Sequence, residues 1–542
     1  MQCSLVVLLR YPPSPLQPAC TMAPRGTYLA AAALLLPLLG PVAAVNVSVP
    51  SSAPSGAQTL SPTLVSFSIE QDRWPDWVGT DSPNDFTTNA LLNYADLTGT
   101  PPDIRVGANS EDKTVWSPSV TINEDEFPPP NTITPFPEAT HITVGDGYYQ
   151  LSRFLPRGTR MTWGVNFGAD NVTNAVNMAK SIVKAFTTAA VIESGVVLER
   201  IEIGNEADLY SNNGLRPSNY SVNAYVPDWI SVAGPVAEAA GITTNTGSVT
   251  LQGASFANQG FTPREIFSLG ILDSAPGKGI SVISQHHYSG FFCQGGNFPL
   301  VSFLSKAAVR GNLSIFNADI AATHAQGLTY ILGETNSIAC HGAPGVSNTA
   351  GIALWVVDYT LQAATLGIKQ AFFHEGIGFK YNFLQPISLN RSITDGSALD
   401  PPQPPHVQPA YYAGILINTF IGASGAAQLV ELSVDDANVS GYAAFEGGLL
   451  ARAVFVNLES WLTTSTGARP SVRIDFAGRM GSARARRLVI QHADDTANVT
   501  FAGQSFETPN DPRPAGAVVS EMVELSAGLD LRATEAVLVE FL

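Results

Sequence analysis

Eight short apolar runs that alternate with stretches of helical character constrain the fold of this chain most strongly. Runs rich in Val, Ile and Phe that alternate with helices are typical of parallel strands joined by helical crossovers. Eight such units close into a (β/α)8 barrel. We therefore predict an α/β protein with a TIM barrel, whose strands span residues 64–69, 103–106, 161–165, 198–203, 244–250, 281–287, 329–332 and 370–373.

The pattern changes after the proline-rich segment "DPPQPPHVQP" and a last helix predicted over residues 411–420. "SVRIDF" alternates apolar and charged residues, and "YAAFEGGLLARAVFVNL" predicts a hairpin that turns at Gly447 and Gly448. These features indicate an all-β sandwich at the C-terminus. We predict a catalytic barrel over residues 61–421 and a sandwich over residues 422–542, which is joined by one strand from residues 45–60.

The N-terminus has the pattern of an export signal. In "MAPRGTYLAAAALLLPLLGPVAA", Arg25 precedes an apolar run that ends in small residues at Ala44. We predict a signal peptide over residues 1–44, with Met22 as an alternative start. A membrane anchor is the competing interpretation, but the run is short for a bilayer and two prolines interrupt it. We therefore expect a secreted, extracellular protein with no membrane partner.

Glycosylation motifs and cysteines fit an oxidising compartment. Of the four cysteines, only Cys293 and Cys340 lie beyond the predicted signal peptide, and an even pair suggests one disulfide. Two separate buried thiols are the alternative. Seven Asn-x-Ser/Thr motifs predict N-glycosylation at Asn46, Asn171, Asn219, Asn312, Asn390, Asn438 and Asn498.

The charge balance limits the possible partners. The net charge is −17, and it becomes −19 without residues 1–44, which contain Arg10 and Arg25 but no acidic residue. Such a chain is not expected to bind nucleic acid, and it must recognise an anionic substrate through local donors. No phosphate-binding or dinucleotide motif is present, and His286 and His287 are adjacent on a strand and point to opposite faces. We expect no cofactor and no metal, and a monomeric protein.

Two acidic residues follow predicted barrel strands in similar settings. Glu206 ends the fourth strand in "IEIGNEADLY", and Glu334 ends the seventh in "YILGETNS". Catalytic groups of such barrels lie where strands end at the C-terminal face. Glycoside hydrolysis needs two carboxyl groups across a cleft, and an adjacent amide such as Asn205 can hold a sugar hydroxyl. The spacing therefore favours a glycosidase.

Alternative interpretations exist for each of these acids. A single glutamate in a loop is most often a solvated surface residue. Glu70, Glu202 and Glu375 are rival acids, and Glu202 is expected to point into the barrel as a paired structural acid. A carbohydrate-binding protein without activity is the competing function, but such a protein is expected to lack one of the two acids.

Several motifs together resemble a known family. "GNE", "GETNS" and "HHY" after strands four, seven and six resemble the clan A glycoside hydrolases. "SFSIE", "IRVGANS", "GETNSIAC" and "FFHEGIGFKY" are similar to family 79, the β-glucuronidase and heparanase group, and above all to its secreted fungal members. The resemblance extends from about residue 45 to the end of the chain.

The resemblance implies a retaining exo-β-glucuronidase that releases glucuronic acid, with or without a 4-O-methyl group, from glycan side chains such as arabinogalactan. An endo-acting, heparanase-like enzyme or another clan A β-glycosidase is the alternative. In this family, Glu206 matches the acid/base and Glu334 the nucleophile. Asn205 matches the residue on the 2-hydroxyl, and Tyr288 matches the tyrosine that hydrogen-bonds the nucleophile.

The resemblance also implies a set of sugar contacts. Glu70 and Asn109 match positions that contact hydroxyls of the sugar. Tyr381 and the backbone N–H groups of the loop from Cys340 to Gly342 match the groups that bind the sugar carboxylate in this family. The chain departs from the family in "ACHGAPG", where His341 stands in place of a smaller residue. His341 is a candidate donor to the uronate, but a histidine on a surface loop is the favoured interpretation.

Overall fold

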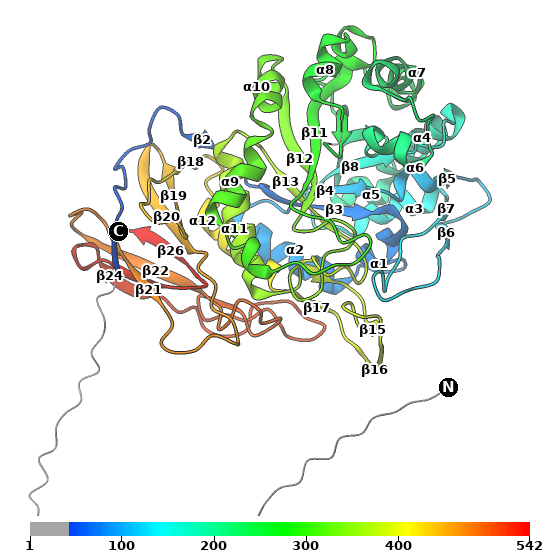
Figure 1. The fold of residues 1–542 in the computed structure, drawn as a ribbon. Coiled ribbons are helices and arrows are strands. Elements are labelled where there is room, and N and C mark those ends of the chain that lie inside the picture. Colours follow the sequence, from blue (N-terminus) through cyan, green and yellow to red (C-terminus); the bar gives the residue numbers. More distant parts are fainter. Residues whose placement is uncertain (1–42, 259) are drawn as a thin grey trace, which may run out of the picture. The chain divides into compact units, whose positions relative to one another are not determined.

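The computed structural model describes residues 43–258 and 260–542. Its largest element is a closed barrel of eight strands, all paired in parallel. The chain enters each strand from an outer helix or loop and leaves it at one rim (Figure 1). The strands are β3 (Val65–Glu70), β4 (Ile104–Gly107), β8 (Arg160–Val165), β9 (Val197–Ile203), β10 (Thr250–Phe256), β11 (Ile280–Tyr288), β12 (Thr329–Asn336) and β13 (Ala371–Glu375).

The predicted fold class is confirmed, and seven of the eight predicted strands coincide closely with observed ones, while the fifth shares only Thr250 with β10. The prediction of a fifth strand over residues 244–250 was wrong, because β10 begins only at Thr250. Gly253, Ala254 and Ser255 have low β-propensity, yet the strand forms because it pairs with both β9 and β11. Tertiary pairing therefore decided the position of this strand.

Helices cover the outside of the barrel. The main ones are α2 (Asp85–Thr98), α4 (Val172–Phe186), α7 (Val222–Ala240), α8 (Pro263–Ser268), α9 (Lys306–Ser314), α10 (Asn317–Ala325), α11 (Ala350–Thr365) and α12 (Ala410–Ile421). α11 is buried along almost its whole length, because barrel strands cover one side and the sandwich covers the other.

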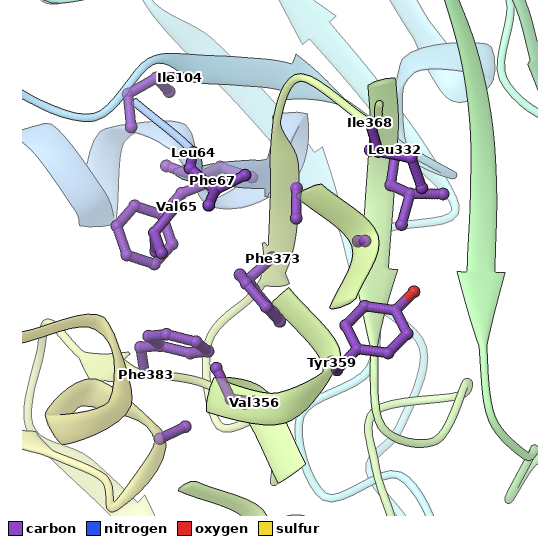
Figure 2. Close-up of a cluster of buried hydrophobic side chains, with 14 of the residues drawn as sticks. Leu64, Val65, Phe67, Ile104, Leu332, Val356, Tyr359, Ile368, Phe373 and Phe383 are labelled. Atoms are coloured by element: carbon purple, nitrogen blue, oxygen red, sulfur yellow. The ribbon is translucent and has the colours of Figure 1, made fainter. Parts of the chain in front are cut away.

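A cluster of large apolar side chains joins α11 to the barrel. Figure 2 shows Phe67 and Ile104 of the neighbouring strands β3 and β4 at one side of the cluster, and Leu332 of β12 at the other. The ring of Phe383 packs edge-on against Phe67 with centroids 5.5 Å apart. Full burial of such side chains stabilises a fold by about 1.5–3 kcal/mol each. The cluster thus fixes the strands that carry the rim residues.

The sandwich consists of two sheets at one side of the barrel (Figure 1). The smaller sheet has the order β1-β21-β25, and its strand β1 (Ala43–Asn46) pairs in parallel with β21 (Ser471–Asp475), while β25 (Leu529–Arg532) lies on the other side of β21. The larger sheet has the order β2-β18-β19-β20-β26-β22-β23, and β24 pairs with β22. Its strands are β2 (Gln58–Thr59), β18 (Gln428–Glu431), β19 (Val439–Glu446), β20 (Leu449–Asn457), β22 (Ser482–Val489), β23 (Thr500–Phe501), β24 (Glu521–Glu524) and β26 (Glu535–Phe541).

Both ends of the described chain therefore contribute to the sandwich. The predicted hairpin is present as β19 and β20, and both of its turn glycines have positive φ angles, 56° at Gly447 and 80° at Gly448. Most of the predicted signal peptide, including Met22, lies outside the described residues. Ala43 and Ala44 belong to β1, so cleavage after Ala44 would shorten this strand by two residues.

The larger sheet is apolar on both faces. Phe455 and Val537 belong to the core between the two sheets, whereas Val454, Val456 and Leu538 belong to the core shared with the barrel helices. Alternate residues of one strand point to opposite faces, so a strand buried on both faces is apolar at every position. This arrangement makes barrel and sandwich parts of one compact unit.

Long connections extend the barrel rim. The segment after β4 forms a small sheet of β5 (Thr114–Trp116), β7 (His141–Val144) and β6 (Asn123–Glu126). After β13 the chain forms two short antiparallel pairs, β14 (Leu384–Gln385) with β17 (His406–Val407) and β15 (Leu389–Arg391) with β16 (Ala398–Gln403). None of the helices in the described part of the chain has the length and apolar character needed to span a membrane.

Candidate active site

The two predicted catalytic acids lie at the same rim of the barrel. Glu206 is the third residue after β9, and Glu334 is near the end of β12. One carboxylate oxygen of each lies within 4.8 Å of the other, and a ring nitrogen of His286 lies within the same distance of both. The structure thus brings together two residues that are far apart in the sequence.

Glu206 has a backbone conformation that is unusual for a residue with a side chain. Its φ angle is 53° and its ψ angle is 49°, in the left-handed region. Asp112 stabilises the preceding turn, because its carboxylate accepts hydrogen bonds from the backbone N–H of Asn205 at 3.3 Å and from the hydroxyl of Tyr210 at 2.6 Å. Such conformations cluster at functional sites, where the surrounding structure maintains them.

Arg105 on β4 lies below the two acids, and its guanidinium group makes five hydrogen bonds. Nη1 donates to Glu334 Oε2 at 2.7 Å and to Ser68 Oγ at 2.9 Å. Nη2 donates to Asn205 Oδ1 at 2.7 Å, and both Nε and Nη2 donate to Glu202 Oε1. A planar guanidinium has five donors, so each of them is used. Arg105 therefore fixes the orientation of both Glu334 and Asn205.

Glu202 is the buried structural acid that the sequence predicts at this position. It is fully buried, and its second oxygen accepts hydrogen bonds from Gln252 and from Ser255, the latter at 2.6 Å. A buried ion pair persists when its remaining donors and acceptors are satisfied. Glu202 thus keeps Arg105 in place but lies away from the cavity.

Glu111 is a further buried acid beside this ion pair. Neither of its carboxyl oxygens has a hydrogen-bond partner among the described residues. Burial, and then the negative charges of Glu202 and Asp112, raise the pKa of Glu111 well above its usual value. The raised pKa favours the neutral form of Glu111, which limits the negative charge that gathers below Glu334.

Glu334 is held as a carboxylate. Burial by itself would raise its pKa, but the positive charges of His374, His286 and Arg105 outweigh this effect. The hydroxyl of Tyr288 also donates to Glu334 Oε1 at 2.7 Å. Together these groups lower the pKa of Glu334 to about 2. An ionised, firmly oriented carboxylate is the form that a nucleophile requires.

The second acid has a different partner. His286 Nδ1 lies 2.9 Å from Glu206 Oε1 and 4.0 Å from Glu334 Oε2. Glu206 is partly exposed to the cavity, whereas His286 is buried. His286 thus bridges the two carboxyl groups and can exchange a hydrogen bond with the more exposed one.

Glu70 lies one layer behind the cavity. It is fully buried, and its carboxylate accepts hydrogen bonds from the backbone N–H and the hydroxyl of Ser110. His374 Nε2 lies 3.2 Å from its other oxygen. Burial would lower the pKa of His374, but the charge of Glu334 and the hydrogen bond to Glu70 raise it to about 9. His374 therefore stands, as a cation, between Glu70 and the cavity.

His341 does not lie on the surface, and the favoured interpretation of this residue was wrong. Only 8% of it is exposed, and its ring stacks on Phe379 with centroids 3.7 Å apart. Its Nε2 lies 3.0 Å from Glu138 Oε1, and Lys113 Nζ donates to Glu138 Oε2 at 3.2 Å. Despite burial, the contacts with His341 and Lys113 lower the pKa of Glu138. Sequence reasoning failed here because the segment that covers the loop is far away in the chain.

A cavity of about 860 Å³ lies above the two acids. Among the predicted site residues it is lined by Glu206, Glu334, Asn109, Tyr288, Tyr381 and His341. Asn205, Glu70 and Gly342 are not among the lining residues, and Asn205 instead connects Arg105 to Asn109 behind the wall. Glu375 does not line it either, since its carboxylate accepts from the backbone N–H groups of Phe383 and Leu384.

The loop after β12 contains three successive residues with positive φ angles, Cys340, His341 and Gly342. The N–H of Gly342 donates to the carbonyl of Ile338 at 3.1 Å, so it is not available to a ligand, contrary to the expectation. The N–H groups of Cys340 and His341 have no acceptor in the described part of the chain. Two adjacent free N–H groups in such a turn can bind an anion.

The predicted disulfide between Cys293 and Cys340 is present, with a Cα–Cα distance of 5.0 Å. It joins the loop after β11 to the loop after β12. Of the predicted glycosylation sites, Asn46, Asn171, Asn219, Asn390, Asn438 and Asn498 are exposed. Asn312 is only partly exposed, and its amide donates to Ser289 Oγ at 3.1 Å.

Glu206, His286 and Glu334 are also close enough to share a metal ion. However, both oxygens of Glu334 already accept strong hydrogen bonds from Arg105 and Tyr288, and His286 Nδ1 is paired with Glu206. The facing atoms of the trio are thus mostly paired with protein groups, although Nε2 of His286 has no partner among the described residues, and this pairing fits acid–base chemistry better than metal binding.

Sequence reasoning missed Arg105, His286 and Glu138 as site residues. Arg105 stood in the quoted motif "IRVGANS", and a charged residue in the middle of an apolar barrel strand was a usable signal. His286 was considered only as a metal ligand. Glu138 lies in the long connection after β4, and its position carries no pattern that predicts a contact with residue 341.

Comparisons with known proteins agree with this geometry. Residues 441–538 match the model of the glycosyl hydrolase family 79 C-terminal β domain. A β-glucuronidase of Neurospora crassa is 27% identical over 516 residues, which cover 85% of this chain and 87% of that protein. A β-glucuronidase of Aspergillus niger is 28% identical over 487 residues, which cover 85% of each chain.

Solved structures show the same fold. The 4-O-α-L-rhamnosyl-β-D-glucuronidase from Fusarium oxysporum 12S superposes with a TM-score of 0.75 at 22% identity, covering 92% of this chain and 100% of that one. The family 51 α-L-arabinofuranosidase AbfB from Bifidobacterium longum gives a TM-score of 0.56 at 14% identity, covering 92% and 99%. With the sequence matches, these findings confirm the resemblance described above: the chain is a glycoside hydrolase that is similar to family 79.

Proposed function

We propose that the protein is a secreted, retaining exo-β-glucuronidase. It releases terminal glucuronic acid, with or without a 4-O-methyl group, from glycan side chains such as those of arabinogalactan. The observation that carries this proposal is the close pair of Glu206 and Glu334 at the base of a cavity. The β-glucuronidases of Neurospora crassa and Aspergillus niger support the choice of sugar.

The reaction proceeds by two displacements at the anomeric carbon. Glu334 attacks this carbon while Glu206 donates a proton to the glycosidic oxygen, so that the leaving group departs as an alcohol. In the second step Glu206, now ionised, takes a proton from water, and the water oxygen attacks the anomeric carbon and displaces Glu334. Glu206 is then protonated again, and Glu334 is a free carboxylate again. Retaining glycosidases have carboxyl groups about 5–5.5 Å apart, while inverting ones need about 6.5–9.5 Å. A separation of oxygens within 4.8 Å supports the retaining mechanism.

The groups at one end of the cavity support a uronic acid as substrate. Tyr381, His341 and the free N–H groups of Cys340 and His341 lie at this end. Glu138 would repel a carboxylate, but its own charge is offset by hydrogen bonds with His341 and Lys113. Backbone and neutral donors bind an anion locally in a protein whose overall charge is negative.

The alternative of an endo-acting, heparanase-like enzyme is less well supported. A sulfated chain requires basic side chains along its groove. No lysine or arginine side chain lines the cavity in the part of the chain that the structure describes. A binding protein without activity is also disfavoured, because both acids are present together with the groups that orient and ionise Glu334.

A panel of aryl glycosides tests this proposal. The secreted protein is assayed against matched 4-nitrophenyl β-glucuronide, β-glucoside and β-galactoside, and kcat/KM is compared. We expect the glucuronide to be preferred by at least about 100-fold, since a neutral sugar leaves the anion-binding groups unpaired. A preference for a neutral glycoside would contradict the uronate assignment, while the acid pair would still support a glycosidase.

A further inference from the structure

The cavity extends beyond the two acids toward one arc of the barrel. In the closed barrel, β9, β10 and β11 are neighbours on one side, and β13, β3 and β4 are neighbours on the other. β12, which carries Glu334, connects the two arcs. Glu206 follows β9, and it protonates the leaving group in the proposed reaction. The leaving group therefore occupies the β9–β11 half of the cavity.

The wall of this half differs in chemistry from the other half. Beyond His286, His287 and the residues that follow them on β11, it contains four apolar side chains and two amides, namely Leu209, Ala257, Phe291, Ile315, Asn213 and Asn258. The opposite half contains Glu138, His341 and His374, which are charged or can become charged. Asn213 is exposed and Asn258 is partly exposed, and no hydrogen bond of their side-chain amides is found among the described residues.

Phe291 is exposed although its backbone is firmly held. It is 71% exposed, the highest value among the aromatic residues in the described part of the chain, and Ile315 nearby in the same wall is 53% exposed. The backbone N–H of Phe292 donates to the carbonyl of Ala339 at 3.1 Å, and the N–H of Ala339 donates to the carbonyl of Gly290 at 2.8 Å. The disulfide at Cys293 anchors the same loop. A large apolar side chain that is exposed on a rigid loop at a cavity mouth indicates a binding surface.

We propose that these six residues form a subsite for a neutral glycosyl leaving group, with Phe291 as the platform on which the sugar ring stacks. The inference rests on the proposed function and specifies what the glucuronic acid is linked to. A pyranose has an apolar face of C–H groups, which fits an aromatic ring, and a rim of hydroxyls, which fits free amides. An anionic or sulfated sugar finds no lysine or arginine among the described lining residues and meets a protein of net charge −17.

The volume of the cavity agrees with this assignment. About 860 Å³ is near the upper end of the range of roughly 300–1,000 Å³ that is common for small-molecule sites. A single glucuronic acid bound at the acids leaves the β9–β11 half unfilled. The subsite therefore gives the enzyme a reason to prefer a glycan over a simple glucuronide.

Kinetics on three glucuronides test the subsite. The substrates are methyl β-D-glucuronide, which has no second ring, glucuronic acid β-linked to galactose, and glucuronic acid β-linked to N-sulfoglucosamine. We expect the wild-type protein to prefer the galactoside over the other two. Phe291→Ala should lower kcat/KM for the galactoside by about three- to tenfold more than for the methyl glucuronide, the range for losing one ring contact. Phe291→Trp should restore the preference.

A matched control is Phe127→Ala, since Phe127 is another partly exposed aromatic residue but does not line the cavity. It should leave the ratio of the two kcat/KM values unchanged. An equal loss for both substrates in Phe291→Ala, or an equal or better rate with the sulfated disaccharide, would overturn the subsite.

A binding experiment separates this inference from the proposed function. Saturation-transfer NMR with methyl β-D-galactoside should show contact with the wild-type protein and a reduced signal with Phe291→Ala. If the wild-type protein hydrolyses no glucuronide but still binds the galactoside through Phe291, then the glucuronidase proposal fails and the subsite stands. If the wild-type protein gives no signal, or if Phe291→Ala binds equally well, the subsite is refuted.

Discussion

At the scale of single residues, the site depends on how its charges are distributed. Three buried carboxyl groups, those of Glu111, Glu202 and Glu334, surround the single guanidinium of Arg105. The raised pKa of Glu111 favours its neutral form, and the cationic His374 offsets part of the remaining negative charge. The result is a carboxylate at Glu334 that stays ionised although it is buried, which an isolated buried carboxyl group does not do.

Substitution of Glu334 and substitution of Glu206 should change the dependence of the rate on the leaving group in different ways. Glu334→Gly should lower kcat by at least about 10⁴-fold, because no other group can form the covalent intermediate. Azide should then restore turnover by attacking from the vacated position. Glu206→Ala should retain most of the first step with 4-nitrophenyl glucuronide, since a good leaving group needs little protonation. Rates with aryl glucuronides of different leaving-group pKa measure this difference.

The control for this pair is Glu111→Gln, in which an amide replaces a buried acid of nearly the same shape that does not line the cavity. It should keep kcat within a few-fold of the wild-type value. The same leaving-group dependence in both Glu334→Gly and Glu206→Ala would contradict the assigned roles.

At the scale of elements, the loops that leave β11 and β12 work as one unit. The disulfide joins them, and the connected segment carries Phe291 on one side and the free N–H groups of Cys340 and His341 on the other. In the chain-entropy model, a loop closed across a sequence separation of 47 residues stabilises the fold by about 4 kcal/mol.

Loss of the disulfide should damage substrate binding more than it damages folding. In Cys340→Ser we expect KM for glucuronides to rise at least about tenfold, because the N–H groups lose their fixed position. The melting temperature should fall by no more than about 8 °C, since a destabilisation of about 4 kcal/mol shifts a large protein by roughly 2 °C per kcal/mol at most. Steady-state kinetics and thermal unfolding of the same samples provide both values. Cys293→Ser is the matched variant, and a large loss of stability at unchanged KM in both would refute the idea.

Sequence patterns predicted elements and rim positions better than contacts between distant segments. The strand ends at Glu206 and Glu334 could be located because barrel strands have recognisable apolar runs and a fixed catalytic face. The disulfide could be predicted because only two cysteines lie beyond the predicted signal peptide. The strand over residues 244–250 was misplaced because threonines and a valine there have higher β-propensity than the small residues of β10. The burial of His341 depends on Glu138 and Phe379, whose approach to it no local pattern encodes.

At the scale of the whole molecule, the charges of the site should set the pH range of greatest stability. The pKa of Glu334 falls from 4.5 to about 2 on folding, so its contribution is complete above pH 4.5 and is lost as the pH falls toward 2. The pKa of His374 rises from 6.5 to about 9, so its contribution is complete below pH 6.5 and is lost as the pH rises toward 9. Both contributions are complete between about pH 4.5 and 6.5.

Thermal unfolding from pH 3 to pH 10 tests this coupling. The wild-type protein should show its highest melting temperature within that window. In Glu334→Gln the decline on the alkaline side should be smaller and should end at lower pH, because His374 loses the carboxylate that most strongly raises its pKa. The decline on the acid side should become shallower. Identical pH profiles of the two proteins would show that these groups do not act together.

The pairing of β1 with β21 determines the order in which the molecule can be completed. Ala43 of β1 lies beside Val472 of β21, and the entire barrel is made on the ribosome between them. Strands with partners so distant in the chain form late, because the chain must first close a very long loop. The strand that is synthesised first is therefore among the last to find its place. Until then its Val45 lacks the partner strand that buries it, and an unpaired apolar strand of this kind is prone to aggregation.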